Sequence, residues 1–380
     1  MITQKRRLTA IDKTRAFAIL CMITIHFGPG VFDRLPSLDF LMEPVLFLGR
    51  FATTAFIIVF GITIGYIYID KYIAAPGPVS KKIYARARLL FIYAIIICIP
   101  NYINLVIQGD TNPSHWLYGT YSILNYYAIA LFTLPLWLRF LTQNLVRNSL
   151  LLGASFWILG YLLLQFWHFD DALVFRRYEE LDLYLPENPD HLGFLEYLRL
   201  TFISGPYAYL QLSGSAILAI LAGYFLRKLN NAGRITEISY YLIPISLVLT
   251  VSGIVLGIYF QEFSIHNVVV GDIKAPPRLW YWLFFSGPTL LVLLLFVIID
   301  LRPKSLAERA TYPLAIFGQG SLIIYTGHSF VLPMINWLDV IYPTEGLLRI
   351  LIPFLLFFAF CGLVMMYYHR QNQVILTATS

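Results

Sequence analysis

The segment WYWLFFSGPTLLVLLLFVIID, residues 280–300, decides the fold class of this chain. Its only charged side chain is its last residue, Asp300. A stretch of about 20 apolar residues is long enough for an α-helix to cross the hydrocarbon core of a bilayer. A helix also satisfies its own backbone hydrogen bonds, which lipid cannot do. The segment therefore predicts a transmembrane helix.

The whole chain has the composition of a membrane protein. Of its 380 residues, 58% are apolar and 13% are charged, and the mean hydropathy is +0.70. A soluble domain carries roughly 25% charged residues, so much of this surface must face lipid. The three cysteines lie in apolar segments without disulfide or metal-ligand spacing, so we expect no bound metal. The net charge of +6 reflects loop topology, so we expect no nucleic-acid partner.

About ten segments can span a bilayer, which predicts an all-α polytopic integral membrane protein. They are residues 14–32, 45–69, 88–108, 117–138, 149–167, 205–226, 239–260, 280–300, 311–333 and 347–368. With both chain ends in the cytosol (N-in/C-in), most of the 27 Lys and Arg residues fall in cytosolic loops, as the positive-inside rule requires. We interpret residues 1–380 as a single transmembrane domain with an extracytoplasmic loop at about 168–203. The spacing of Gly61 and Gly65 favours close packing of two helices.

Ionisable side chains inside apolar segments are costly and usually mark function. Arg15 and His26 are eleven residues apart, which places them on one helix face, about 16 Å apart along the axis. In the N-in orientation, Arg15 lies at the cytosolic mouth and His26 lies past mid-bilayer. Asp12 is three residues before Arg15 and is placed to pair with it. The alternative roles are a topological flank residue for Arg15 and a hydrogen-bonded core histidine for His26.

Other polar side chains fall between mid-membrane and the outer surface. Arg50 either snorkels outward or faces the bundle, where it binds an anion or orients a partner. His328 is either a site residue or an interfacial histidine. Gln319 and Ser321 lie deeper and suit interhelical hydrogen bonds. A cavity that opens outward is indicated by the polar side chains that share this depth, which are His26, Arg50, Asn101, Asn125, Gln211 and His328.

A basic run precedes the third apolar segment on the cytosolic side. It includes Lys82, Arg86 and Arg88. The run either follows from topology and contact with anionic lipid, or it forms a phosphate-binding patch at a cytosolic entrance.

Four pieces of the sequence resemble the membrane-bound acyltransferase 3 superfamily. Residues 7–26, RLTAIDKTRAFAILCMITIH, resemble its opening, in which Arg15-x10-His26 matches an Arg followed at this distance by a His. Three later pieces look like its second-helix block, the basic start of its third helix and its late block ending in His: FIIVFGITI (56–64), YARARLL (84–90) and GQGSLIIYTGH (318–328). The opening is also similar to that of OpgC-like glucan succinyltransferases and heparan glucosaminide acetyltransferase-like proteins. The sequence departs from the pattern at Phe60, where Ser is common, and at Ala16, where Gly is more frequent.

The resemblance implies a transmembrane acyltransferase. Such an enzyme moves an acyl group from cytosolic acyl-CoA, which is a substrate and not a bound cofactor, to a hydroxyl or amine of an extracytoplasmic glycan or lipid. It implies that His26 is a general base or briefly carries the acyl group, and that Asp12 orients Arg15. Besides Arg15, the implied donor-binding residues are Arg86, Arg88 and Lys82. The implied acceptor side, where a developing oxyanion is stabilised, comprises Arg50, His328, Ser321, Gln319 and Asn101.

Two other functions fit the same sequence. A membrane transporter or flippase of a glycan or lipid-linked solute would also need many helices and an outward polar cavity, although no internal repeat is evident. A membrane scaffold or sensor with a degenerate site would tolerate loss of His26 and Arg15 together. In each case we expect a multi-pass protein of a cell membrane, either a plasma membrane or a bacterial inner membrane, in contact with membrane lipids.

Overall fold

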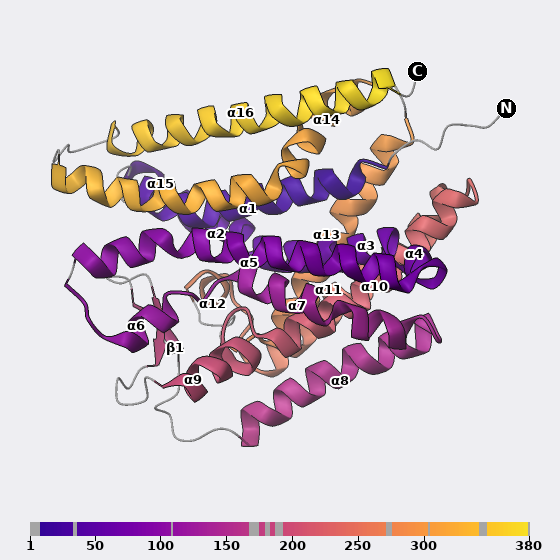
Figure 1. Cartoon of the computed structure of the whole chain (residues 1–380), viewed down its shortest axis with the longest axis horizontal. Coiled ribbons are helices and arrows are strands. Elements are labelled where there is room, and N and C mark those ends of the chain that lie inside the picture. Colours follow the sequence, from indigo (N-terminus) through magenta and orange to yellow (C-terminus); the bar gives the residue numbers. More distant parts are fainter. Residues whose placement is uncertain are drawn as a thin grey trace. The chain divides into compact units, whose positions relative to one another are not determined.

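The computed structural model describes residues 8–32, 36–107, 109–166, 175–178, 183–186, 193–270, 276–302, 305–341 and 348–378. Most of these residues are helical (Figure 1). A short hairpin pairs β1 (Phe175–Tyr178) with β2 (Leu183–Pro186) in antiparallel register. The expected all-α class is therefore confirmed.

Eight helical stretches of the described chain are long and apolar enough to cross a membrane. They coincide with eight of the expected segments, so the polytopic membrane class is also confirmed. The other two expected segments, 14–32 and 311–333, are helical too, but they are not among these eight stretches of the described chain. A total of ten spans and the N-in/C-in orientation stay predictions.

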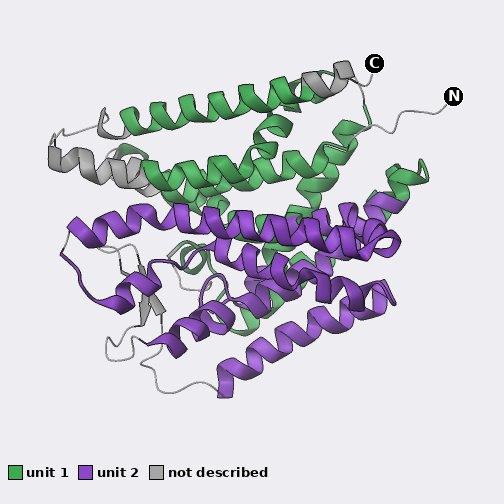
Figure 2. Cartoon of the chain, in the orientation of Figure 1, with its two compact units in different colours: residues 1–59, 229–269, 283–380 green, residues 60–228, 270–282 purple. Residues whose placement is uncertain are grey.

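The chain divides into two compact units, each assembled from separate stretches of sequence (Figure 2). Unit 1 comprises residues 1–59, 229–269 and 283–380, and unit 2 comprises residues 60–228 and 270–282. Most or all of the following elements belong to unit 1: α1 (Ala10–Phe32), η1 (Pro36–Leu41), α2 (Met42–Gly49), η5 (Ile235–Glu237), α11 (Ile238–Tyr259), α12 (Ile265–Val270), α13 (Leu279–Asp300), α14 (Leu306–Gln319), α15 (Ser321–Ile341) and α16 (Leu348–Ala378).

Unit 2 begins within α3 (Phe51–Ile67), which both units share. Besides the hairpin, it holds the following elements: α4 (Ile69–Ala74), α5 (Pro76–Ile107), α6 (Pro113–Tyr118), α7 (Ile123–Leu141), α8 (Leu145–Phe166), α9 (Phe194–Arg199), the π-helix η4 (Leu200–Ser204) and most of α10 (Tyr209–Asn231).

Helix α1 is the centre of the candidate site in unit 1, and it packs against α2 and α14. The expected segment 311–333 is not one continuous helix. It breaks at Gly320, and α14 stands at a steep angle to α15 (Figure 1). Gly318 lies directly against the backbone of α1, where an added Cβ would overlap the carbonyl oxygen of Asp12. Only glycine permits this approach of α14 to α1.

Glycines also set the closest packing within unit 2. Gly61 and Gly65 of α3 lie against the carbonyl oxygens of Ala216 and Ile220 in α10, where a Cβ on either glycine would overlap them. The close helix packing predicted from the spacing of these glycines is therefore confirmed.

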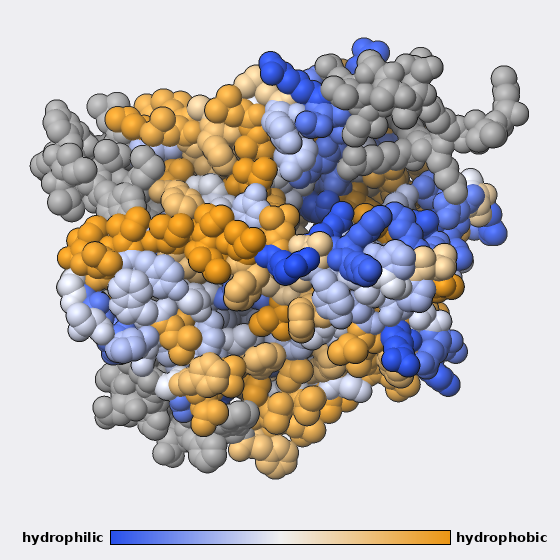
Figure 3. Space-filling model, in the orientation of Figure 1, coloured by the Kyte–Doolittle hydropathy of each residue, from blue (hydrophilic) through white to orange (hydrophobic). Residues whose placement is uncertain are grey.

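Helix α5 presents hydrophobic side chains to its surroundings, visible as a band in Figure 3. Its exposed large apolar residues are Leu89, Phe91, Ile92, Ile95, Ile99, Ile103, Val106 and Ile107. Lys82, Arg86 and Arg88 are exposed toward the start of the same helix. An exposed apolar band with charges at one end is typical of a helix that meets lipid along most of its length.

The expected extracytoplasmic loop at 168–203 is described only in part. It contains the hairpin and α9, and it runs into η4. Residues 167–174, 179–182 and 187–192, which carry most of the acidic side chains of this connection, lie outside the described residues.

Candidate active site

Helix α1 carries the two first candidates, Arg15 and His26. It is continuous from Ala10 to Phe32, so the spacing keeps both side chains on one face, about 16 Å apart along the axis. Both side chains are half-buried. The shared helix face expected from the sequence is therefore present.

His26 lies beside His328 of α15. Their ring centroids are 5.1 Å apart and the rings are inclined by 52°. His328 is buried, with an exposed fraction of 3%. Its Nδ1 is hydrogen-bonded to the backbone carbonyl of Tyr325. Because a carbonyl oxygen can only accept, Nδ1 must donate, which leaves Nε2 as the atom of the neutral ring that can take a proton.

Aromatic rings surround this histidine pair. The ring of Tyr325 lies 4.9 Å from that of His328 and 6.1 Å from that of Phe56. Further along α1, Phe27 stacks on Phe357 of α16 at 5.7 Å. Apolar walls keep the local dielectric low, which strengthens any interaction between the imidazoles and a developing charge.

Asp12 positions Arg15 at the other end of the same helix face. Nη1 of Arg15 donates to Oδ1 of Asp12 at 2.8 Å. The Asp12 side chain is 7% exposed and that of Arg15 is 26% exposed. Since the backbone of Asp12 is itself held against Gly318, the guanidinium is oriented by a residue that two helices fix in place.

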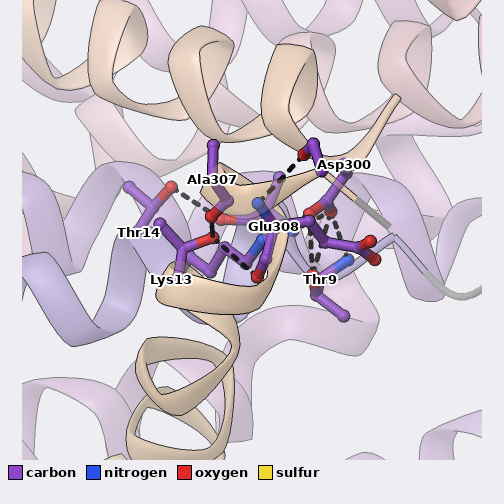
Figure 4. A network of polar contacts seen from close by, with 9 residues as sticks. Thr9, Lys13, Thr14, Asp300, Ala307 and Glu308 are labelled. Atoms are coloured by element: carbon purple, nitrogen blue, oxygen red, sulfur yellow. Dashed lines mark hydrogen bonds and ion pairs between the residues drawn. The ribbon is translucent and has the colours of Figure 1, made fainter. Parts of the chain in front are cut away.

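A buried ion pair next to these residues was not expected from the sequence (Figure 4). Nζ of Lys13 lies 2.6 Å from Oδ1 of Asp300, and their side chains are 1% and 8% exposed. Oδ2 of the same carboxylate accepts the backbone N–H groups of Thr9 and Ala10 at 2.7 Å each. Asp300 therefore caps the start of α1 from the end of α13, where an anion is favoured by the helix dipole.

The sequence contained one signal for this ion pair. Asp300 is a lone carboxylate at the end of an otherwise uncharged segment, and such a group needs a buried partner. The sequence does not identify Lys13 as that partner, because spacing along one helix does not show which side chain another helix brings close.

Arg50 is placed inside unit 1 by a break in the expected segment 45–69. The chain turns at Arg50 between α2 and α3. Its Nη2 donates to the backbone carbonyl of Val269 in α12, and its side chain is half-buried. Arg50 was expected either to snorkel outward or to face the helix bundle, and in the structure it faces other helices.

The remaining acceptor-side candidates have differing surroundings. Oε1 of Gln319 accepts from Nδ2 of Asn372 in α16 at 2.9 Å, so Gln319 makes an interhelical hydrogen bond. Ser321 is half-buried at the first position of α15. Asn101 is half-buried in α5, which belongs to unit 2.

The three donor-binding candidates all lie on α5 in unit 2. Lys82 and Arg86 are four residues apart and share a helix face, whereas Arg88 is turned about 200° from Arg86. The guanidinium of Arg86 is hydrogen-bonded to the hydroxyl of Tyr68 and lies 5.6 Å from its ring centroid. The three cations therefore do not form one face of α5.

The arrangement in unit 1 suits proton transfer and binding of an anion. An imidazole pair can take and return a proton, and an oriented guanidinium can bind a phosphate or carboxylate. In the part of the chain that the structure describes, no three His, Cys, Asp or Glu side chains are placed to hold a metal ion.

Comparison with known proteins gives one match. The family model of acyltransferase 3, an acyltransferase domain, covers residues 8–369 and runs through both units. No curated protein and no solved structure matches the chain significantly. The matched range contains every candidate residue of the site. The chain therefore belongs to the acyltransferase 3 family and is a membrane acyltransferase.

Proposed function

We propose that this enzyme transfers an acyl group from acyl-CoA on the cytosolic side to a hydroxyl or amine of a glycan or lipid on the outer side of a cell membrane. Membership of the family supports the reaction class. The observation that supports the location of the site is the facing pair of His26 and His328. The membrane is either a plasma membrane or a bacterial inner membrane.

His26 acts as the general base in this proposal. The acceptor oxygen attacks the thioester carbonyl while an imidazole nitrogen of His26 takes the hydroxyl proton. The new C–O bond forms as the C–S bond breaks, and the proton passes to the thiolate of the leaving coenzyme A. His328 lies beside His26, and its unprotonated Nε2 is suited to accept a hydrogen bond from the imidazolium that His26 becomes, which stabilises the transferred proton. In a variant of the same chemistry, His26 first takes the acyl group and then passes it on.

Arg15 binds phosphate groups of the donor in this proposal. Its pairing with Asp12 fixes the direction of its remaining donors, and arginine binds phosphate through several N–H groups at once. Lys82, Arg86 and Arg88 supply further positive charge on the same side of the membrane.

Transfer in membrane vesicles tests the proposed role of His26. Inside-out vesicles expose the cytosolic side to radiolabelled acetyl-CoA, and label is then counted in the glycan and lipid fractions. We expect His26→Ala to lower transfer by about 10²–10⁴-fold. His266→Ala is the matched control, because this histidine is 68% exposed and pairs only loosely with Glu43 at 3.1 Å.

The outcomes of this assay separate the alternatives. Normal transfer by correctly inserted His26→Ala protein would remove His26 from the mechanism. Label that crosses the membrane without covalent attachment to any fraction would indicate a transporter or flippase. Loss of transfer in His26→Ala with normal transfer in His266→Ala supports the proposal.

A further inference from the structure

A buried arginine in unit 2 has hydrogen-bonding groups that none of the described residues satisfies. Arg199 is the last residue of α9 and is 4% exposed. Its Nε and Nη1 have no hydrogen-bond partner. Glu196, three residues earlier on α9, acts on this charge electrostatically, but the two side chains form no ion pair. Arg199 therefore carries a buried charge without a hydrogen-bonded counter-ion from the described chain.

An arrangement of this kind is unfavourable unless something else binds there. Burying a charge without a hydrogen-bonded partner is strongly unfavourable, and each buried donor that makes no hydrogen bond adds to this cost. Buried polar groups in native proteins are nearly always satisfied by the protein, by water or by a ligand. An arginine in this state points to an anion.

The backbone around Arg199 is also unusual. The π-helix η4 (Leu200–Ser204) starts directly after it. π-Helical turns are rare in proteins overall, but where they occur they are often found at functional sites. Gln211 of α10 donates from Nε2 to the carbonyl of Ile203 at 2.8 Å, one helical turn beyond Arg199. The Oε1 of Gln211 is a second buried atom without a partner. The segment thus holds an unsatisfied donor group and an unsatisfied acceptor close together in sequence.

We propose that Arg199 binds the oxygens of a phosphate group, at a site in unit 2 distinct from the histidine pair in unit 1. Arginine is the residue best suited to this ligand, because its planar group presents several N–H donors to several phosphate oxygens. This site does not depend on the acyl-transfer proposal.

The surroundings favour the headgroup of a phospholipid as the source of the phosphate. Leu198 and Thr201, which flank Arg199 in sequence, line a cavity of about 230 Å³, although Arg199 itself is not part of the lining. Its lining includes Leu198, Thr201, Phe202, Phe91, Ala94 and Ile95. The side chains of Phe91 and Ile95 are more than half exposed on the hydrophobic band of α5. The cavity is smaller than the roughly 300–1,000 Å³ of pockets for drug-sized ligands, and its apolar lining suits one hydrocarbon chain.

Two titrations of the full-length protein in detergent micelles test the site and separate its sources. One adds inorganic phosphate, and the other adds phosphatidylglycerol, with diacylglycerol as the matching lipid that lacks phosphate. Unfolding temperature and native mass spectrometry report binding in each titration. The variants are Arg199→Met, which keeps the length of the side chain without its charge, and Arg139→Met, which removes an exposed arginine of α7 in the same unit.

We expect phosphatidylglycerol to stabilise the wild type and Arg139→Met far more than diacylglycerol does. Arg199→Met should bind it at least about tenfold more weakly, since hydrogen bonds to charged groups are worth about 1.5–3 kcal/mol. Stabilisation by inorganic phosphate alone would identify free phosphate as the source and would still support the site.

Three results would overturn the site. One is equal stabilisation of the wild type by phosphatidylglycerol and diacylglycerol with no response to inorganic phosphate. Another is unchanged binding in Arg199→Met. If Arg199→Met fails to fold, Arg199→Lys replaces it, and unchanged phosphate and lipid binding by Arg199→Lys would count equally against the assignment, because lysine cannot reproduce the planar set of donors.

Discussion

His328 has two nitrogen atoms with separate roles, so single substitutions can divide them. We expect His328→Asn to keep a donor near the carbonyl of Tyr325 and to lose the nitrogen at the Nε2 position. The protein should then keep nearly normal stability while kcat falls by about 10²–10⁴-fold, the range that a group taking part in proton transfer contributes. Transfer kinetics in vesicles, read beside unfolding temperature, measure both effects. A large loss of stability with unchanged kcat would show that His328 only supports the fold.

In the proposed function Asp12 acts on the donor through Arg15, so its substitution should change donor binding more than turnover. We expect Asp12→Asn to raise the KM for acyl-CoA several-fold with a smaller change in kcat, because a guanidinium without its carboxylate adopts more orientations. The matched control is Glu237→Gln, which breaks the exposed pair with Arg234 at the same three-residue spacing. Equal effects of both substitutions would assign Asp12 a general electrostatic role.

The residues predicted from the sequence were those whose relation lies along a single helix. Arg15, His26 and Asp12 could be related by helical periodicity alone, and the pairing of Asp12 with Arg15 is present. The contact of His26 with His328 and that of Lys13 with Asp300 join helices that are far apart in sequence. Periodicity contains no information on which distant helix lies opposite, so these partners could not be derived.

At the scale of the elements, α1 is tied to α14 through Gly318. We expect Gly318→Ala to lower both stability and acyl transfer, because its Cβ would overlap the carbonyl of Asp12 and push α14 away from α1. Gly362→Ala is the matched control. A Cβ on Gly362 in α16 meets nothing within 4 Å, so this change should stabilise the helix by about 0.5–1 kcal/mol. Thermal unfolding and vesicle transfer test the pair, and equal behaviour of the two variants would contradict this role of Gly318.

The cap of α1 by α13 leads to a second expectation at this scale. Asp300→Ala should destabilise the protein by about 3–5 kcal/mol, since it leaves Lys13 buried without a partner and uncaps α1. Lys13→Met should cost less, because the carboxylate of Asp300 keeps the N–H groups of Thr9 and Ala10. Denaturation in mild detergent ranks the two variants. The reverse order would mean that the ion pair outweighs the cap.

The expected helices matched best where nothing interrupts the apolar run. Residues 280–300 were predicted as one segment and form α13. The breaks at Arg50 and Gly320 were not predicted, although Arg50 and the stretch GQGS (318–321) interrupt the apolar residues there, because each expected segment as a whole has the length of one span. Their cause lies in contacts with other helices, such as the hydrogen bond from Arg50 to Val269.

At the scale of the whole molecule, the predicted orientation can be tested with thiol labels. The native cysteines Cys21, Cys98 and Cys361 are buried, so background labelling should be low. In intact cells, a membrane-impermeant maleimide should label Thr111→Cys, which lies on the predicted outer side. Lys82→Cys should react only after the membrane is permeabilised. The opposite pattern would reverse the N-in/C-in assignment, and labelling of both sites in intact cells would break the predicted alternation of the helices.

The fixed start of α1 has a consequence for how the enzyme can move. The carboxylate of Asp300 accepts hydrogen bonds from the backbone at the start of α1, and Gly318 packs against the backbone of α1 at Asp12. If α1 moved along its axis by one helical turn, about 5.4 Å, it would lose its cap at Asp300. The movement would also bring another part of α1 against Gly318, where the two helices are in close contact. We therefore expect α1 to stay in place during the reaction cycle, and any opening for the substrate to come from movement of other helices relative to α1.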